Sequence, residues 1–499
     1  MTVAAPGAAV KDITQISRTY NWDTMKGYGR GIWAPCLTFN PGNHRFYVHF
    51  ADPDFGIFMA WTDDITKNQW HDLQEVVRPD GTGFGAGWDD CGVLWDDDGQ
   101  GYMAANHFEA NYKNYLYTLS QNGYQLQDEG VLIHETGDGL YKSYEGNPEA
   151  LKILKKDGYY YIYHNGVVDG IRKAFLMRSE GIYGKHQDGV LGSRENPGDY
   201  EHIPYPIVEG YREPNQGNLI DILNEQGEKE WFFWMHQGKT DMDGRPNSLI
   251  PVIWNSDGWP VAGREDIRRA GDMVWRRIKK PLNSGKVIRP QTGDDFDGDA
   301  LGFQWMWNCQ PREGYWSLQE RKGFLRLKAF RPVEYDRLEA AGNSLIQRMY
   351  RSERNVVTSK MDITQMEDGQ FAGQLYLMGG RAAGIGICQD KGERYIRFKG
   401  NADVYGEKIP SEVRYLYFKA EWDKSMLVRS YYSFDGIAYI PFGEEYQIVE
   451  SDYKGGHIGF FNYNNLSDAG LVDIDYFHYE MDVIGSRNLG SADPSSPVG

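Results

Sequence analysis

Three features are scarce in this sequence: cysteine, long apolar runs and net positive charge. Four cysteines are scattered over 499 residues with no CxxC motif or Cys/His cluster, so neither a disulfide framework nor a zinc site is expected. No apolar run approaches the roughly 18 residues that cross a membrane. Lys and Arg total 53 against 71 Asp and Glu, and the formal charge of −18 argues against nucleic-acid and anionic-membrane partners.

The sequence as it stands also lacks the features of a signal peptide. Its first residues, MTVAAPGAAVKD, contain no basic start followed by an apolar stretch. A cytoplasmic location is therefore the default expectation.

Aromatic residues and glycine are abundant. Trp, Tyr and Phe make up 14% of the chain, and glycine occurs 59 times, which is typical of many short strands joined by tight turns. Aromatic side chains together with an excess of carboxylates also suit a carbohydrate-handling protein. Packing in a β-rich protein explains the same counts, so both interpretations stay open.

A repeat occupies the first 260 residues. Each unit consists of a short apolar strand, a glycine turn and an aromatic-rich strand. The turn glycines are spaced by 57, 59 and 69 residues, at Gly42, Gly99, Gly158 and Gly227. A period near 60 with several strands per unit predicts a β-propeller, and an irregular all-β domain is the alternative.

The organisation of the chain follows from this repeat. Residues 1–30 are too few for a further unit and are expected to form a connecting segment, whereas residues 31–262 form the propeller. The basic stretch 263–292 is expected to be a linker. Ten short segments with alternating polarity predict a two-sheet β-sandwich over residues 293–483, and 484–499 form a polar tail.

Candidate catalytic residues stand just before the first strands of the repeats, and such positions converge at one end of a propeller channel. Asp89 and Asp90 precede GVLW, Glu149 precedes ALKIL, and Gln216 precedes GNLIDIL. Convergent carboxylates in an aromatic-lined funnel suit glycoside hydrolysis, in which one carboxylic acid protonates the leaving oxygen and another carboxylate activates water. Ordinary acidic hairpin loops give the same pattern.

Several motifs taken together resemble glycoside hydrolase family 43. Its successive blades are matched by GIWAPCL, WDDCGVLWDDDGQGYM, EALKILKKDGYYYIYHNG and GRPNSLIPVIWNSDGWPV. The sandwich attached to the family's β-xylosidase-like members is matched by DDFDGDALGFQWMWN, GFLRLKAF and DIDYFHYE, so the resemblance covers roughly residues 28–480. It implies an exo-acting, inverting enzyme, a β-xylosidase or α-L-arabinofuranosidase, that releases terminal xylose or arabinose from hemicellulose fragments of plant cell walls.

The resemblance also implies roles for two carboxylates. Glu149 matches the general acid, with Glu145 in the nearby EGNP as the alternative. Asp90 matches the aspartate that orients this acid and raises its pKa, with Asp89 as the alternative. Trp33 and Arg245 resemble substrate-lining residues of the family, with a core Trp and a loop salt bridge as the alternatives. Gln216 is a third candidate for binding the substrate.

The catalytic base is not located by the resemblance. Family members have five blades and carry an Asp base in the first, ahead of GIWAP, whereas this sequence is expected to hold only four complete blades. Asp52 and Asp54 are candidate bases because they flank the expected gap. Alternatively the chain is catalytically impaired, or another copy completes the propeller, so a homo-oligomer is expected.

No cofactor is expected for the chemistry, and a structural calcium ion is the one metal considered. Some family members hold an axial calcium through a His, but Gln216 stands at that position. In the sandwich, Asp295 or Asp297 together with Asp473 or Asp475 offer oxygen ligands for calcium, although Asp-rich turns explain the same residues.

Two rival functions remain at this level. One is a carbohydrate-binding protein without catalysis, and the other is a galactanase-type member of the same family. Turnover of aryl β-xyloside or aryl α-arabinofuranoside would separate an enzyme from a binding protein.

Overall fold

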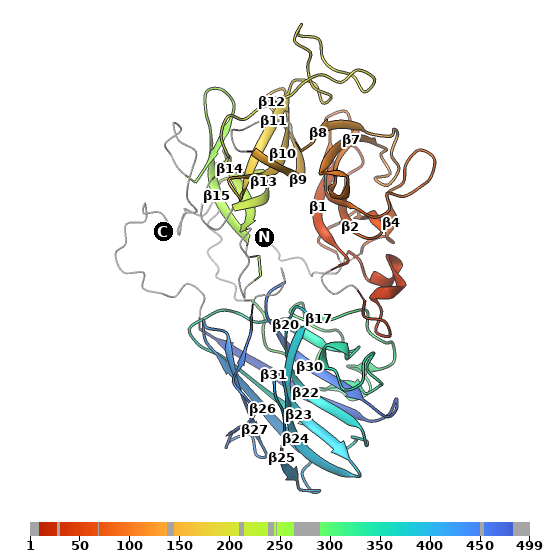
Figure 1. Ribbon diagram of the computed structural model, residues 1–499, viewed down its shortest axis with the longest axis vertical. Helices are drawn as coiled ribbons and strands as arrows, with labels where there is room; N and C mark the ends of the chain where they lie inside the picture. Colours follow the sequence, from red (N-terminus) through yellow and green to blue (C-terminus); the bar gives the residue numbers. More distant parts are fainter. Residues whose placement is uncertain are drawn as a thin grey trace, which may run out of the picture.

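The computed structural model describes residues 9–26, 30–67, 69–136, 144–208, 214–237, 244–245, 247–263, 290–449 and 454–482. Most of the predicted linker, residues 264–289, and the predicted tail, residues 484–499, lie outside them. Figure 1 shows two β-rich parts, with strands β1 to β16 above and strands β17 to β31 below. Helical structure in the described ranges consists of short 3-10 segments: η1 (Ile13–Gln15), η2 (Arg18–Tyr20), η3 (Phe108–Ala110) and η4 (Leu338–Ala340). None of these helices has the length and apolar character that crossing a membrane requires.

The first part is a propeller of four antiparallel sheets with four strands each. The first sheet contains β1 (Trp33–Asn40), β2 (Arg45–Asp52), β3 (Gly56–Thr62) and β4 (Gln74–Glu75). The second contains β5 (Trp88–Trp95), β6 (Gly101–His107), β7 (Lys113–Leu119) and β8 (Val131–His134). The third contains β9 (Tyr144–Lys156), β10 (Tyr159–Val168), β11 (Ile171–Ser179) and β12 (Glu201–His202). The fourth contains β13 (Pro214–Leu223), β14 (Lys229–Gln237), β15 (Asn247–Trp254) and β16 (Pro260–Ala262).

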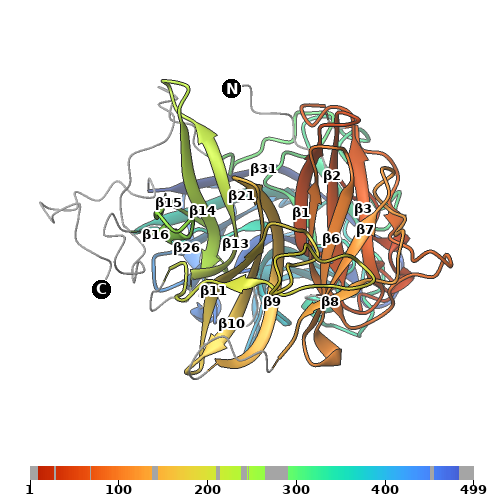
Figure 2. The same ribbon diagram turned by 90° about the horizontal axis from the view of Figure 1, so that it is seen from above.

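The hairpins of these sheets form because their turns contain residues that tolerate positive φ. Gly99, Gly158 and Gly227 have φ values between 79° and 83°, as the repeat predicted. In the first hairpin Gly42 also lies in the turn, as predicted, but the left-handed residue is His44, with φ 57°. The four sheets follow one another in sequence order, and the first strands of neighbouring sheets are in contact (Figure 2).

The first strand of each sheet carries a register shift at the same place. The shifts lie between Trp33 and Cys36, between Asp89 and Gly92, next to Glu149, and between Asn215 and Asn218. Each contains one non-glycine residue with positive φ: Ala34 (41°), Asp90 (50°), Ala150 (67°) and Gln216 (47°). Such a conformation costs on the order of 1–3 kcal/mol and is typical of functional sites. A bulge re-aims the side chains beside it, so all four strands turn these residues to one region.

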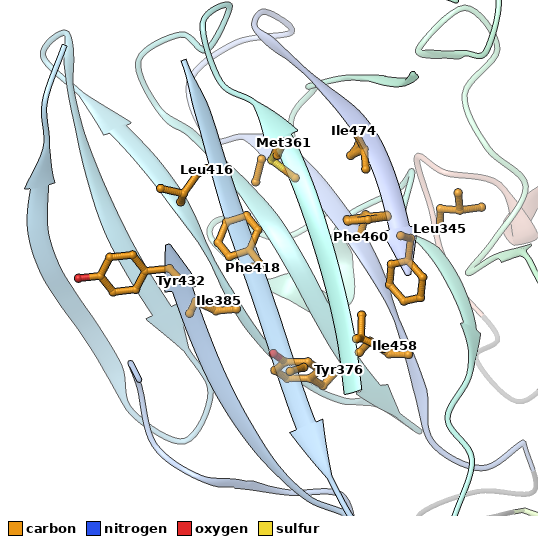
Figure 3. Packing of buried hydrophobic residues seen from close by; sticks show 14 of the residues in the cluster. Leu345, Met361, Tyr376, Ile385, Leu416, Phe418, Tyr432, Ile458, Phe460 and Ile474 are labelled. Atoms are coloured by element: carbon orange, nitrogen blue, oxygen red, sulfur yellow. The ribbon is translucent and has the colours of Figure 1, made fainter. Parts of the chain in front are cut away.

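The second part is a β-sandwich. Its seven-stranded sheet contains β17 (Met306–Trp307), β20 (Leu345–Arg348), β30 (His457–Asn464), β22 (Gln370–Met378), β23 (Arg381–Asp390), β24 (Glu393–Lys399) and β25 (Asp403–Ile409). Its eight-stranded sheet contains β18 (Trp316–Ser317), β19 (Leu325–Lys328), β31 (Leu471–Met481), β21 (Asn355–Asp362), β26 (Tyr415–Trp422), β27 (Leu427–Ser433) and β28 (Ile440–Pro441), with β29 (Tyr446–Gln447) paired to β27. Large apolar residues such as Ile385, Phe418 and Phe460 fill the space between the sheets (Figure 3). The predicted all-β fold, a propeller of four blades followed by a β-sandwich, is confirmed.

The segment before the first sheet contacts both parts. The Tyr20 hydroxyl donates to Asp52 Oδ2 at 2.6 Å, at the end of β2. The Gln310 backbone N–H donates to the Tyr20 carbonyl at 3.0 Å, and the Trp22 ring packs on Phe330 of the sandwich with centroids 5.2 Å apart. Residues 9–26 therefore fasten the first sheet to the sandwich.

Candidate active site

A cavity of about 470 Å³ lies where the four register shifts meet. Each sheet contributes side chains: Trp33 from β1, Asp89 and Asp90 from β5, Glu149 from β9 and Gln216 from β13. These are residues that the sequence pointed to, and Arg245 lines the same cavity. Four separate stretches of chain therefore bring their polar residues to one place.

Asp90 is held firmly by residues of the next two sheets. Its side chain is 1% exposed, and its Oδ2 accepts the backbone N–H of Ala150 at 2.8 Å. The Gln216 amide nitrogen lies 3.2 Å from both Asp90 carboxylate oxygens. Since Ala150 directly follows Glu149, the hydrogen bond fixes Asp90 beside the strand that carries Glu149.

Gln216 links Asp90 to two basic side chains. Its amide nitrogen donates to Asp90, and its Oε1 accepts from Arg245 at 3.3 Å. The His236 Nε2 lies 2.7 Å from the same oxygen. Gln216 thus lines the cavity as the sequence suggested, but its described contacts make it a connector between Asp90 and Arg245.

Glu149 has the electrostatic environment of a proton donor. Burial, and then the negative charge of Asp90, raise its pKa to about 7, although Arg172 and Arg245 act in the opposite direction. The Arg172 Nε lies 3.1 Å from Glu149 Oε1. A carboxylic acid with a pKa near the working pH can give up its proton and recover it, which general acid catalysis requires.

Asp89 is the third carboxylate of the cavity. Burial, and then the charge of Asp90, raise its pKa to about 8. Asp89 was considered as the alternative to Asp90, but it is Asp90 that binds the Ala150 N–H. The side chain of Glu145, the alternative to Glu149, lies outside what the structure describes.

Sequence reasoning missed Arg30, which directly precedes GIWAP, and two further basic residues of the cavity, Arg172 and Lys454. Arg172 is the second residue of β11, and its side chain reaches Glu149 across the sheet. Lys454 comes from the sandwich, so both parts of the chain contribute to the cavity. Neither Arg172 nor Lys454 belongs to a motif, and only the assembled fold reveals them.

The two candidate bases lie elsewhere. Asp52 is fully buried, with its carboxylate bonded to the Tyr20 hydroxyl and to the Asp54 backbone N–H. Asp54 is about half exposed and lies 3.5 Å from Arg30. Neither residue lines the cavity, whose carboxylates are Asp89, Asp90 and Glu149.

The proposed calcium ligands of the sandwich are not gathered around a common point. Asp473 accepts hydrogen bonds from Arg321 and Arg326, and Asp475 pairs with Lys360 at 2.6 Å. Asp295 lies 2.6 Å from His478, and Asp297 is exposed. Within the described residues, no three His, Cys, Asp or Glu side chains form a group that could hold a metal. Asp473 and Asp475 therefore pair with basic side chains in the structure and not with each other around a metal.

Comparison with known proteins agrees with this geometry. The family model "Glycosyl hydrolases family 43" matches residues 9–260, and "Beta xylosidase C-terminal Concanavalin A-like domain" matches residues 293–480. A beta-xylosidase of Formosa agariphila is 31% identical and aligns over 93% of this chain and 80% of its own length. A putative beta-xylosidase of Xylanibacter ruminicola is 32% identical over 90% of this chain and 77% of its own length.

A solved structure has the same fold along nearly the whole chain. The bifunctional GH43-CE protein of Bacteroides eggerthii superposes with a TM-score of 0.72 at 26% identity, covering 93% of this chain and 56% of that one. Both family models and the curated relatives agree on one assignment. This chain therefore belongs to glycoside hydrolase family 43 and is a glycoside hydrolase.

Proposed function

We propose that this enzyme is an exo-acting, inverting glycosidase that releases terminal xylose or arabinose from hemicellulose fragments, acting as a β-xylosidase, an α-L-arabinofuranosidase or both. The observation that carries the proposal is Glu149, a buried carboxyl with its pKa raised to about 7 at the wall of a cavity of about 470 Å³. Relatives named beta-xylosidase and non-reducing end alpha-L-arabinofuranosidase support these two sugars.

In the proposed mechanism Glu149 donates its proton to the glycosidic oxygen while the bond from that oxygen to the sugar breaks. The negative charge of Asp90 keeps the proton on Glu149 until the leaving group needs it. Arg172 then stabilises the carboxylate that remains. Inversion also needs a carboxylate that activates water on the other face of the sugar. Asp52 and Asp54 do not line the cavity, so the proposal covers the acid half of the reaction.

The two parts of the chain have different tasks in this proposal. The propeller, residues 31–262, carries the acid and its orienting aspartate. The sandwich, residues 293–483, closes one side of the cavity through Lys454 and bounds the leaving-group side. The partner is a carbohydrate, and the chemistry uses side chains and water without a cofactor.

Hydrolysis of aryl β-xyloside, aryl α-L-arabinofuranoside and xylo-oligosaccharides tests the proposal. We expect turnover of at least one aryl pentoside, with single pentoses as the only early products from oligosaccharides. Proton NMR during the reaction should show the product first in the inverted anomeric form. Pentose binding without turnover would support a carbohydrate-binding protein instead, and preferential cleavage of a galactan would support the galactanase alternative.

A further inference from the structure

Asp89 occupies in β5 the place that Glu149 occupies in β9. Each residue directly precedes the left-handed residue of its register shift, Asp90 in one strand and Ala150 in the other. Both line the same cavity. Neighbouring sheets therefore contribute two carboxyl groups from equivalent positions to one cavity, and the proposed mechanism uses only one of them.

The Asp89 side chain lines the cavity and has one oxygen without a hydrogen-bond partner in the described part of the chain. Its Oδ1 is shielded from solvent and has no hydrogen-bond partner among the described residues. Across the sheet, Asp89 pairs with Asn106 of β6, and directly opposed residues place their side chains on the same face. Leaving such buried atoms unpaired costs about 1–3 kcal/mol each, so the site gains when a ligand supplies the partner.

Asn106 supplies an acceptor beside Asp89. Its Nδ2 donates to Asn114 Oδ1 at 2.6 Å and to the Pro148 carbonyl at 2.8 Å, which fixes the amide with its oxygen turned away from both. That oxygen has no partner within the described part of the chain, and Asn106 lines the cavity. Each residue of this cross-strand pair therefore has one oxygen without a partner among the described residues.

The protonation state of Asp89 decides what it can do. Burial, and then the charges of Asp90 and Glu149, raise its pKa to about 8, so the group carries a proton at neutral pH. A protonated carboxyl donates a hydrogen bond, whereas activating water requires a carboxylate. A sugar hydroxyl both accepts and donates, and it matches a donor placed next to an acceptor.

We propose that Asp89 and Asn106 together bind one hydroxyl group of the glycosyl unit, with the Asp89 carboxyl donating to it and Asn106 Oδ1 accepting from it. This pair then selects sugars that carry a hydroxyl at that ring position. The inference rests on the proposed function, because it takes the occupant of the cavity to be a pentosyl unit.

Deoxy substrates test this assignment directly. Aryl β-xyloside and its 2-, 3- and 4-deoxy analogues are compared in the wild type, Asp89→Ala and Asp89→Asn. The preference for the complete sugar is its kcat/KM divided by that of the deoxy analogue. For one analogue this ratio should be about three- to tenfold smaller in Asp89→Ala than in the wild type, which corresponds to the loss of one net hydrogen bond. Asp89→Asn keeps a donor and should retain most of the preference. Equal preferences in the wild type and Asp89→Ala for all three analogues would overturn the assignment.

A matched control and a second readout keep the outcome clear. Asp128 is a buried aspartate of the loop between β7 and β8, outside the cavity, and accepts the Thr118 and Gly130 backbone N–H groups. Asp128→Asn should therefore leave the preferences unchanged. If no aryl pentoside is turned over, the proposed function fails, and calorimetry with free xylose and arabinose still tests Asp89, because Asp89→Ala should weaken binding about three- to tenfold. Unchanged affinity, or a loss of turnover in Asp89→Asn as complete as in Glu149→Gln, would contradict the proposal.

Discussion

Glu149 is governed by a balance of four neighbouring influences. Burial and Asp90 disfavour its charge, whereas Arg172 at 3.1 Å and Arg245 favour it, and the result is a pKa of about 7. A glutamic acid near its ordinary pKa would be ionised at neutral pH and unable to donate. Burial and Asp90 therefore keep a proton available on Glu149 near neutral pH.

Replacing Glu149 by glutamine should remove proton donation and preserve the fold. On xylo-oligosaccharides we expect kcat to fall about 10²- to 10⁴-fold, the usual contribution of a general acid. Aryl substrates with very good leaving groups should lose much less, because their oxygen needs little protonation. Glu180, an exposed glutamate that directly follows β11 and pairs with Lys185, provides the control variant Glu180→Gln. Full activity of Glu149→Gln on oligosaccharides would disprove the assignment.

The pH profile should move in opposite directions when opposite charges near Glu149 are removed. In Asp90→Asn the pKa of Glu149 falls, so the alkaline limb of kcat/KM should shift to lower pH by about one unit. In Arg172→Gln the pKa rises and the same limb should shift to higher pH. Profiles of kcat/KM from pH 4 to 10 check both variants. Shifts in the same direction, or no shift in Asp90→Asn, would show that these charges do not set the pKa of Glu149.

At the level of elements, one repeated irregularity builds the site. The first strand of each sheet contains a register shift with one left-handed residue, and the residues beside these shifts line the cavity. A regular strand would alternate its side chains between the two faces of the blade. The bulges cost conformational energy and in return turn residues of four sheets toward a common centre.

The cost of one bulge can be measured at Ala34. Its φ of 41° costs an alanine about 1–2 kcal/mol. Glycine relieves that strain but adds about 0.4–1 kcal/mol of unfolded-chain entropy, so Ala34→Gly should gain about 0.5–1 kcal/mol. The melting temperature should then rise by about 2 °C. Ala34→Val should lower it, because a β-branched residue fits this region worse. If valine were tolerated as well as glycine, the strain argument would fail.

At the scale of the whole molecule, apolar side chains are exposed on the first and fourth sheets. Leu37 and Phe39 of β1 are 55% and 45% exposed, and Trp234 of β14 is 53% exposed. Figure 2 shows these two sheets at the two ends of the sequence of blades. Exposed apolar residues become contact surfaces for other proteins where they form a contiguous patch.

We expect these faces to associate with a second copy of the chain, because burying them removes apolar area from water. Light scattering over a range of concentrations should show a mass that rises with concentration, and Leu37→Lys together with Phe39→Lys should abolish the rise. Ile437, 85% exposed on the sandwich, provides the control, since Ile437→Lys should have no effect. A constant monomer mass for the wild type would refute the expectation.

The sequence by itself determined the repeat and therefore the blades. Turn glycines and alternating strands are local signals, because a hairpin depends on residues adjacent in the chain. The same signals led to Asp89, Asp90, Glu149 and Gln216, which were expected just before the first strands and lie inside them in the structure. Trp33 was found through the family resemblance. Counting residues back from each turn glycine, however, does not always identify equivalent residues in two strands. Asp90 and Glu149 both stand nine residues before their turn glycines, yet the structure aligns Glu149 with Asp89, because the loops that close the two hairpins differ in length.

Only the tertiary structure decided which side chains meet. Arg172 approaches Glu149, Lys454 reaches the cavity from the sandwich, and Asn106 stands beside Asp89, although no motif links these residues. The tertiary structure also gives other partners to residues that were predicted as a base or as calcium ligands. Asp52 faces Tyr20, and Asp473 faces Arg321 and Arg326, so their carboxylates are already paired. A carboxylate's role depends on its burial and on the charges around it, and these come from strands far apart in the chain, which meet only when the sheets assemble.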